Sequence, residues 1–175
     1  MPRPVFVAAA VAFFAAAPLA AEPADIINNP GAPQFNGAKV SIHDDAKVQG
    51  GKAIRVEVPG KGKNVWDSAV ESPVTKPVQA GDRLVLAFYA RLEKGENGAT
   101  NVTLPFAGVQ LASDPYTPLF NQAVEIGPEW KLVQVSGAAG KAYAAGTLKA
   151  AIHLATAKQV IDFGPVAVLD LGKAK

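Results

Sequence analysis

From residue 52 onward the chain alternates apolar and polar side chains in short stretches. Successive side chains of a β-strand point to opposite faces, so a period of two predicts strands with one face in a core and the other in solvent. Gly, Pro, Asn and Asp interrupt the pattern where turns are expected. We predict antiparallel strands over 53–58, 64–71, 83–93, 101–112, 119–126, 130–135, 148–156 and 160–171.

Many short strands at regular spacing, with no convincing amphipathic helix, favour a two-sheet sandwich or barrel. The segment 22–51 is less regular and contains Pro23, Pro30 and Pro33, so we expect an extended arm with one short strand around 39–42. The predicted fold is an all-β jelly-roll sandwich of about eight to ten strands, formed by a single domain over 22–175. The chain has no cysteine, and a domain of this length can bury roughly 70% of its unfolded surface without disulfides.

The first 21 residues have the parts of a secretory signal peptide. Arg3 precedes an apolar run over 5–17, and small residues follow at 18–21. The run is shorter than the about 20 apolar residues needed to span a bilayer, although an uncleaved anchor is the alternative. We predict cleavage after Ala20 or Ala21, and an exported chain that is secreted or periplasmic and does not contact the membrane after cleavage.

Composition excludes several classes of function. The 17 basic and 15 acidic residues give a net charge of +2 and are spread along the chain, which is not the pattern of a nucleic-acid-binding protein. The absence of cysteine excludes a thiol nucleophile and a cysteine zinc site. The only histidines are His43 and His153, too far apart for a His-x-x-x-His motif, and no Gly-x-Ser-x-Gly motif occurs. We therefore predict no catalytic residue and no enzyme.

Carboxylates leave two alternatives open. Asp44-Asp45 is the only adjacent acidic pair, and we interpret it as a solvated turn, with calcium ligation as the second interpretation. A glycoside hydrolase would need two carboxylates about 5 to 9.5 Å apart in a cleft. The residues that might supply such a pair are Asp67 together with Glu57, Glu71 or Asp162.

Alternation also assigns side chains to faces. The strand over 83–93 places Tyr89 and Arg91 outward, and the strand over 148–156 places His153 outward. The pattern is irregular near Pro105, as expected at a bulge or edge, and beyond it Gln110 faces outward with Tyr89 and His153. The residues predicted to face the core are Leu84, Leu86, Phe88, Ala90, Leu92, Val109, Leu111, Leu148, Ala150, Ile152 and Leu154.

The two tryptophans have different surroundings. Trp130 follows Gly127-Pro128-Glu129 at the start of a strand, where a large ring usually closes the end of a sandwich, so we predict a structural role. Trp66 lies among small and polar residues. An aromatic ring among polar neighbours suits a sugar, whose C–H face packs on the ring while its hydroxyls need polar partners. A core position for Trp66 is the alternative.

Several stretches occur in an order and spacing typical of one family. They are 48–56 (VQGGKAIRV), 64–67 (NVWD), 76–91 (KPVQAGDRLVLAFYAR), 129–131 (EWK), 151–154 (AIHL) and 161–166 (IDFGPV). In this the chain resembles the CenC-type carbohydrate-binding modules, which are galactose-binding-like jelly rolls appended to xylanases and other glycoside hydrolases. The resemblance spans about 35–171.

The resemblance implies a jelly roll whose concave face forms a cleft for a glycan chain. It implies that Trp66 and Asp67 are cleft residues and that His153 lies on a strand lining the cleft. Tyr89, Arg91 and Gln110 join this predicted ligand-binding set because alternation faces them outward. Tyr116 and Phe120 lie in or near a proline-flanked loop that either presents rings at the rim or is anchored by them.

The family often carries an acidic residue near its start that helps to bind a structural calcium ion, but 32–36 reads APQFN here. We therefore predict no cofactor and leave the metal unassigned. The expected partner is a poly- or oligosaccharide, held without catalysis by stacking and polar contacts. The alternative is a structural or interaction domain of the cell envelope, which uses the same sandwich to bind an envelope protein and no sugar.

Overall fold

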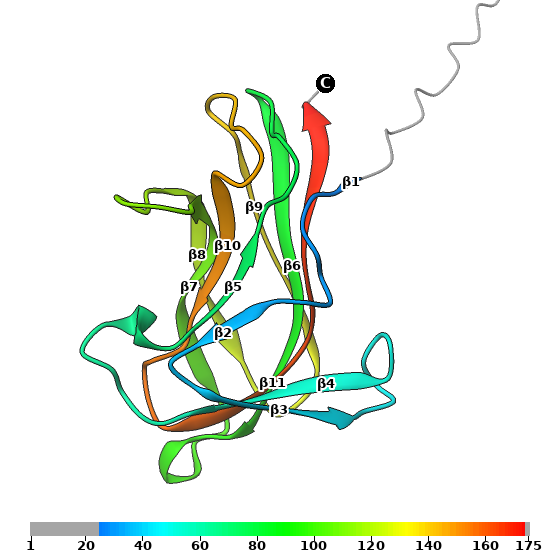
Figure 1. The fold of residues 1–175 in the computed structure, drawn as a ribbon. Helices are drawn as coiled ribbons and strands as arrows, with labels where there is room; N and C mark the ends of the chain where they lie inside the picture. Colours follow the sequence, from blue (N-terminus) through cyan, green and yellow to red (C-terminus); the bar gives the residue numbers. More distant parts are fainter. Residues whose placement is uncertain (1–24, 174–175) are drawn as a thin grey trace, which may run out of the picture.

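The computed structural model describes residues 25–173 and consists of β-strands with two single-turn 3₁₀ helices (Figure 1). No helix in this part of the chain is long and apolar enough to cross a membrane. The predicted signal peptide over 1–21 lies outside the described residues. The elements are β1 (Asp25–Ile26), β2 (Gln34–Asn36), β3 (Lys39–Asp44), β4 (Lys52–Val58), η1 (Val65–Asp67), β5 (Ala69–Pro73), β6 (Asp82–Lys94), η2 (Glu96–Gly98), β7 (Val102–Leu111), β8 (Pro118–Ile126), β9 (Lys131–Ala138), β10 (Leu148–His153) and β11 (Gln159–Lys173).

The strands form two antiparallel sheets, which confirms the predicted all-β sandwich. One sheet has the order β3-β4-β11-β6-β9, with β1 also paired to β11. The other has the order β2-β5-β10-β7-β8. Neighbouring strands within each sheet are often far apart in sequence, so residues from distant segments meet across the sheets (Figure 1).

Seven of the eight predicted strands agree with observed strands to within three residues at each end. The prediction of one strand over 64–71 is wrong, because a 3₁₀ turn, η1, precedes β5. The backbone N–H of Asn64 donates to Asp67 Oδ2 at 2.9 Å, and this local bond closes the turn. Side-chain bonds of this kind compete with strand pairing, and here the turn lifts Trp66 off the sheet.

The core lies between the sheets and contains the residues predicted for it, except that Leu111 is only partly buried and packs against its edge. The five predicted core residues of β6, from Leu84 to Leu92, are each at most 3% exposed. Leu148, Ala150 and Ile152 of β10 are at most 1% exposed. The rings of Phe88 and Phe163, from the two central strands of the six-stranded sheet, lie 6.1 Å apart.

The outward face of β10 is more enclosed than alternation predicts. His153 was predicted to face away from the core, and Ala151 and Ala155 share its side by alternation, yet Ala151, His153 and Ala155 are 0%, 8% and 2% exposed. The strand is the middle one of its sheet, flanked by β5 and β7. Rings from other elements also cover its outward side, since Phe106 stacks on His153. This face therefore forms the floor of a hollow.

The irregularity predicted near Pro105 is present. The pairing of β7 with β8 shifts register between Leu104 and Ala107, because proline has no N–H to donate to the ladder. Beyond the shift, Gly108 lies opposite Asn121, and β8 approaches so closely that a Cβ at Gly108 would lie 2.1 Å from the carbonyl oxygen of Phe120. The approach of the two strands thus requires glycine at this position.

Replacing Gly108 by alanine should destabilise the domain by about 1–3 kcal/mol, the usual cost of forcing extra atoms into a packed site. The measurement is urea unfolding followed by tryptophan fluorescence. The matched control is Gly60→Ala, because an added Cβ there meets nothing within 4 Å. Equal stabilities of the two variants would show that the strands can separate at no cost.

Candidate functional site

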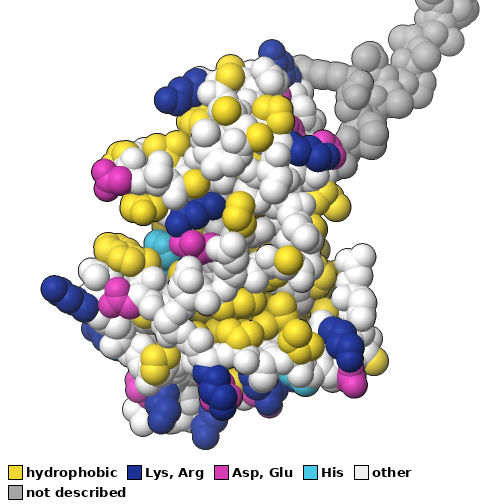
Figure 2. Space-filling model, viewed as in Figure 1, with side chains coloured by type: hydrophobic (Ala, Val, Ile, Leu, Met, Phe, Trp, Pro, Cys, Tyr) yellow, Lys and Arg dark blue, Asp and Glu magenta, His cyan; other side chains and the backbone are white. Residues whose placement is uncertain are grey.

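A hollow of about 810 Å³ lies over the outer face of the five-stranded sheet. Its size is within the range of small-molecule sites in proteins. Basic, acidic and hydrophobic side chains are interspersed on the face of the molecule shown in Figure 2. The aromatic and polar side chains that line the hollow are Trp66, Glu71, Phe106, Gln110, Tyr116, Lys149 and His153.

One end of the hollow is aromatic. Trp66 projects from η1 with 59% of its surface exposed, and its ring meets His153 of β10 edge-on at a centroid distance of 6.0 Å. The His153 ring stacks on Phe106 of β7 at 4.4 Å and 19°. Three elements thus contribute three rings. Trp66 is the most exposed of the three rings.

The other end carries an ion pair. Lys149 Nζ of β10 lies 2.6 Å from Glu71 Oε1 of β5, and the two side chains are 13% and 22% exposed. The same ammonium lies 5.0 Å from the centre of the Tyr116 ring, within the range of a cation–π contact. Tyr116, in the loop between β7 and β8, is 48% exposed.

Two polar side chains in the hollow lack partners within the described residues. Gln110 and His153 are 6% and 8% exposed, and neither side chain has a hydrogen bond to another described residue. Their polar atoms are nevertheless not among those fully enclosed without a partner. Buried polar groups are almost always hydrogen-bonded. These two therefore face the hollow, where water or a ligand can satisfy them.

Burial lowers the pKa of His153 below its usual range, and nearby Lys149 acts in the same direction while Glu71 opposes it. The neutral ring is therefore the favoured form. A neutral imidazole has one donor and one acceptor nitrogen, the combination that a hydroxyl group also has.

The structure brings three of the six sequence-predicted binding residues into this hollow: Trp66, Gln110 and His153. Asp67 is next to Trp66 but does not line the hollow. It accepts hydrogen bonds from the backbone and side chain of Asn64, and these bonds, the backbone one foremost, lower its pKa. In the structure Asp67 holds the turn that presents Trp66.

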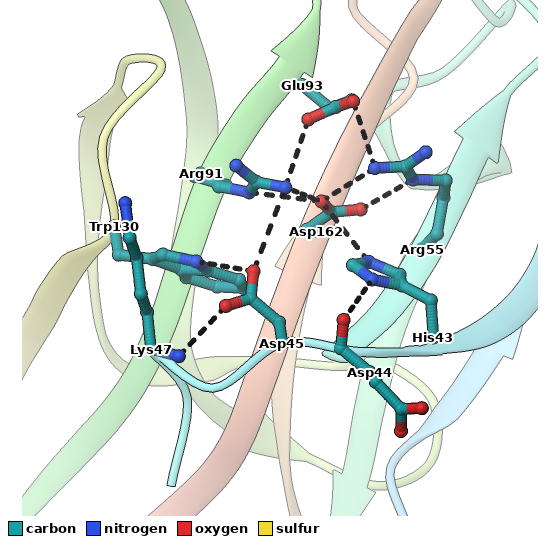
Figure 3. Close-up of polar contacts among 9 residues, drawn as sticks. All are labelled: His43, Asp44, Asp45, Lys47, Arg55, Arg91, Glu93, Trp130 and Asp162. Carbon is teal, nitrogen blue, oxygen red and sulfur yellow. Dashed lines mark hydrogen bonds and ion pairs between the residues drawn. The ribbon is translucent and has the colours of Figure 1, made fainter. Parts of the chain in front are cut away.

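Tyr89 and Arg91 lie on β6, in the six-stranded sheet, and face outward on the opposite side of the sandwich. Arg91 belongs to a network of charged side chains around Asp162 (Figure 3). Alternation correctly faces both residues away from the core. It does not say which of two outer faces they occupy, because that depends on which sheet the strand joins.

Asp162 is the centre of this network and is fully buried. Arg55 donates to its two carboxylate oxygens at 2.8 and 3.0 Å, and Arg91 donates to Oδ2 at 3.1 and 2.8 Å. Glu93 contacts both arginines at 3.0 and 3.1 Å (Figure 3). Burial opposes ionisation of Asp162, but the two arginines outweigh it and hold its pKa below the usual range.

Trp130 joins the same network. Its indole N–H donates to Asp45 Oδ2 at 3.0 Å, and the Arg91 guanidinium lies 5.3 Å from its ring centre (Figure 3). Asp45 also accepts from the backbone N–H of Lys47 at 2.9 Å. Trp130 therefore ties the β3–β4 loop to the outer face of β6. Among residues 25–173, no group of three or more acidic or histidine side chains is placed to hold a metal ion.

Sequence reasoning missed Phe106 and Lys149 as site residues, and it considered Glu71 only as half of a catalytic pair. Lys149 shares the outward face of β10 with His153, so alternation contained a signal for it. The register shift beside Pro105 hid the direction of Phe106. Glu71 reaches the site only because β5 pairs with β10, a contact between segments about 80 residues apart in the chain.

Protein-family models and curated proteins give no match to the sequence. Solved structures do match the fold. A CBM4 carbohydrate-binding module has a TM-score of 0.62 at 17% identity, covering 81% of this chain and 96% of the module. The CBM22-1 xylan-binding domain of Paenibacillus barcinonensis Xyn10C has a TM-score of 0.58 at 16% identity, covering 89% of this chain and all of that domain. The N-terminal cellulose-binding domain of Cellulomonas fimi β-1,4-glucanase C has a TM-score of 0.53 at 18% identity, covering 81% and 90%.

The matches show the fold: the domain is a jelly-roll β-sandwich like these three structures, as the resemblance in sequence predicted. The alignments cover almost the whole length of each of them. At identities of 16–18% the likeness concerns the backbone.

Asp162→Asn should lower the free energy of unfolding by about 2–4 kcal/mol, because it leaves two arginines without their buried partner. The two arginine side chains are partly exposed, so the loss is smaller than for a fully enclosed pair. The stabilisation by Asp162 is present above the unfolded carboxyl pKa and is lost as pH falls through its lowered folded pKa. Urea unfolding at several pH values measures the loss of stability in Asp162→Asn and the pH dependence of the wild type. Asp44→Asn, which removes an exposed surface pair with Lys52, is the control and should change stability little.

His153 should make the folded domain less stable in mild acid. Its pKa is lowered on folding, so the unfolded state binds the proton more readily, and stability falls as pH drops below the unfolded value of about 6.5. His153→Phe preserves ring stacking but cannot titrate. The stability difference between wild type and His153→Phe, measured by urea unfolding from pH 8 to pH 5, should vary with pH. A constant difference would contradict a lowered pKa.

Proposed function

We propose that this chain is an exported, noncatalytic carbohydrate-binding domain that holds a poly- or oligosaccharide in the hollow of its five-stranded sheet. One observation carries the proposal. The exposed ring of Trp66 lies beside two almost fully buried polar side chains, Gln110 and His153, which have no hydrogen-bond partner among residues 25–173 and face the same hollow. A sugar needs this combination, because it presents a C–H face to a ring and hydroxyls to polar groups.

The fold supports the choice of ligand class. Two of the matched structures are described as xylan-binding and cellulose-binding domains, so β-1,4-linked xylose and glucose polymers are the first ligands to test. Export rests on the apolar segment and small residues over 1–21, and a secreted or periplasmic location follows from it.

The state of the carboxylates supports a binding role without catalysis. Each acidic residue that might belong to a catalytic pair is already engaged. Glu71 is paired with Lys149, Asp162 with two arginines, Glu57 with Lys39, and Asp67 with Asn64. A glycoside hydrolase needs one carboxyl group free to protonate the leaving oxygen and a second to act as base or nucleophile.

Trp66→Ala should abolish retention of the mature domain in affinity electrophoresis on xylan and on a soluble cellulose derivative. Binding through one stacked ring and a few polar contacts is weak, in the micromolar to millimolar range, so losing the ring should weaken it by about tenfold or more. The control is Leu132→Ala, which truncates a 44% exposed side chain on β9 of the other sheet. Retention of Trp66→Ala equal to wild type on every glycan that wild type binds would refute the assignment.

The envelope-interaction alternative has one feature in its favour. Val40 and Ile42 on the edge strand β3 are 40% and 69% exposed, and exposed apolar patches often mark protein contacts. Nothing in the described part of the chain shows what covers them. The alternative predicts no glycan retention and capture of an envelope protein. The unpartnered polar groups of the hollow favour a sugar.

A further inference from the structure

A second hollow, of about 720 Å³, lies at one end of the six-stranded sheet and shares no lining residue with the candidate site. Its walls are the ends of four neighbouring strands, β3, β4, β11 and β6, and the loop from β6 to β7. The volume is within the range of small-molecule sites. Basic side chains, with a few acidic ones among them, gather at the lower end of the molecule in Figure 2, where the β6–β7 loop projects in Figure 1. We call this second hollow the sheet-end pocket.

Strand pairing places two lysines at the two ends of a row that crosses the sheet-end pocket. Lys39 of β3 lies opposite Glu57 of β4, which lies opposite Val160 of β11. Val160 in turn lies opposite Lys94 of β6. The two lysines are therefore three strand spacings apart, about 14 Å at the usual spacing. A third lysine, Lys158, lines the pocket just before β11 begins.

Positive charge is in excess in this pocket. Glu57 is paired with Lys39 at 3.4 Å, whereas Lys94 and Lys158 are exposed and have no ion pair with another described residue. Glu96, in the β6–β7 loop, is the other acidic residue among the described residues that line the pocket. Three lysines and two glutamates leave a formal charge of +1. A concave surface with an excess of positive charge attracts anions.

The β6–β7 loop offers polar groups beside these lysines. Gly95 packs so closely on Ala99 that an added Cβ would lie 2.2 Å from the Ala99 carbonyl oxygen, and the N–H of Ala99 donates to the carbonyl oxygen of Glu96 at 3.0 Å. Asn97 has φ of +53°, in the left-handed region that asparagine tolerates better than most residues. The side chains of Glu96 and Asn97 have no hydrogen bond to another described residue. This tightly folded loop can therefore offer a carboxylate and an amide to the hydroxyls of a ligand.

We propose that the sheet-end pocket binds an acidic sugar, with Lys94 and Lys158 paired to its carboxylate or phosphate group and the side chains of Glu96 and Asn97 accepting from its hydroxyls. A neutral sugar lacks the anion that the two lysines need, and an inorganic anion lacks the hydroxyls that the loop can bind. Glu96 repels the acidic group and so favours the orientation in which the hydroxyls face the loop. The site lies on the other sheet from the hollow of the proposed function and does not depend on that function.

The test compares three sugars that share the glucose skeleton and differ at carbon 6: glucuronate, glucose 6-phosphate and glucose. Each is titrated into the mature domain, and binding is followed by the NMR chemical shifts of the backbone amides. At least one of the two acids should bind and shift the amides of 94–97 and 158–160, and glucose should bind at least about tenfold more weakly. The acid that binds more tightly assigns the anionic group as carboxylate or phosphate. Raising the salt concentration from about 0.01 M to about 1 M, which shortens the Debye length from about 30 to about 3 Å, should weaken the binding of the acid.

The double variant Lys94→Gln/Lys158→Gln should bind the acidic sugar at least about tenfold more weakly than wild type. The matched control is Lys47→Gln/Lys141→Gln, which removes the same charge from two exposed lysines outside the pocket and should keep the wild-type affinity. An equal loss in the two variants would overturn the site, because the attraction would then come from net charge alone. Failure of both acids to bind, or glucose binding as tightly as they do, would overturn it as well.

The result can be told apart from a test of the proposed function. Lys94→Gln/Lys158→Gln should bind xylohexaose as wild type does, since neither lysine lines the hollow of the five-stranded sheet. Trp66→Ala should in turn bind the acidic sugar as wild type does. Loss of the acidic sugar in Trp66→Ala would place that ligand in the hollow of the five-stranded sheet and refute the sheet-end pocket.

Discussion

The middle strand of the five-stranded sheet, β10, contributes to both the core and the candidate site, with alternate residues facing each. Leu148, Ala150 and Ile152 pack into the sandwich, while Lys149 and His153 line the hollow on the other face, with the buried Ala151 between them. The alternation of side chains along a strand imposes this arrangement. A shift of one residue in the pairing of β10 would bury Lys149 in the core and dismantle both at once. The packing that stabilises the fold therefore also fixes the positions of the site residues.

Charged side chains play different parts on the two outer faces. On the six-stranded sheet, Asp162 is fully buried and satisfied by two arginines, and the β3–β4 loop closes over the network through Asp45 and Trp130. On the five-stranded sheet, the pair of Lys149 with Glu71 borders open space, beside polar groups without protein partners. In the network around Asp162 the hydrogen-bonding groups pair with one another, and this stabilises the fold. Beside Lys149 and Glu71, hydrogen-bonding groups remain available for the proposed ligand.

The sequence carried most of the fold, because the hydrophobic period of two depends only on local order in the chain. It placed the core faces of β6 and β10 correctly and marked the irregularity at Pro105. It failed at 64–71, where a side-chain bond between Asn64 and Asp67 overrides the strand pattern.

The sequence predicted only part of the candidate site, for a related reason. Outward-facing residues divide between two outer faces, and long-range pairing decides which face each strand supplies. Gln110 and His153 consequently lie together in the hollow, whereas Arg91 lies across the sandwich. Glu71 could not be assigned without the pairing of β5 with β10. Local alternation determines burial, but the membership of a site depends on the topology.

The turn η1 gives the domain a ring that is carried outside the strands and contacts the sandwich through His153. Trp66 belongs to no strand, and the turn that carries it is closed by bonds between Asn64 and Asp67, both outside the core. Substitutions in this segment can move or replace the ring without repacking the interior, which tolerates little change. Ligand preference can therefore diverge between related domains while the strands and their register stay the same. Under the proposed function, directed evolution of new sugar specificities would best begin with this turn.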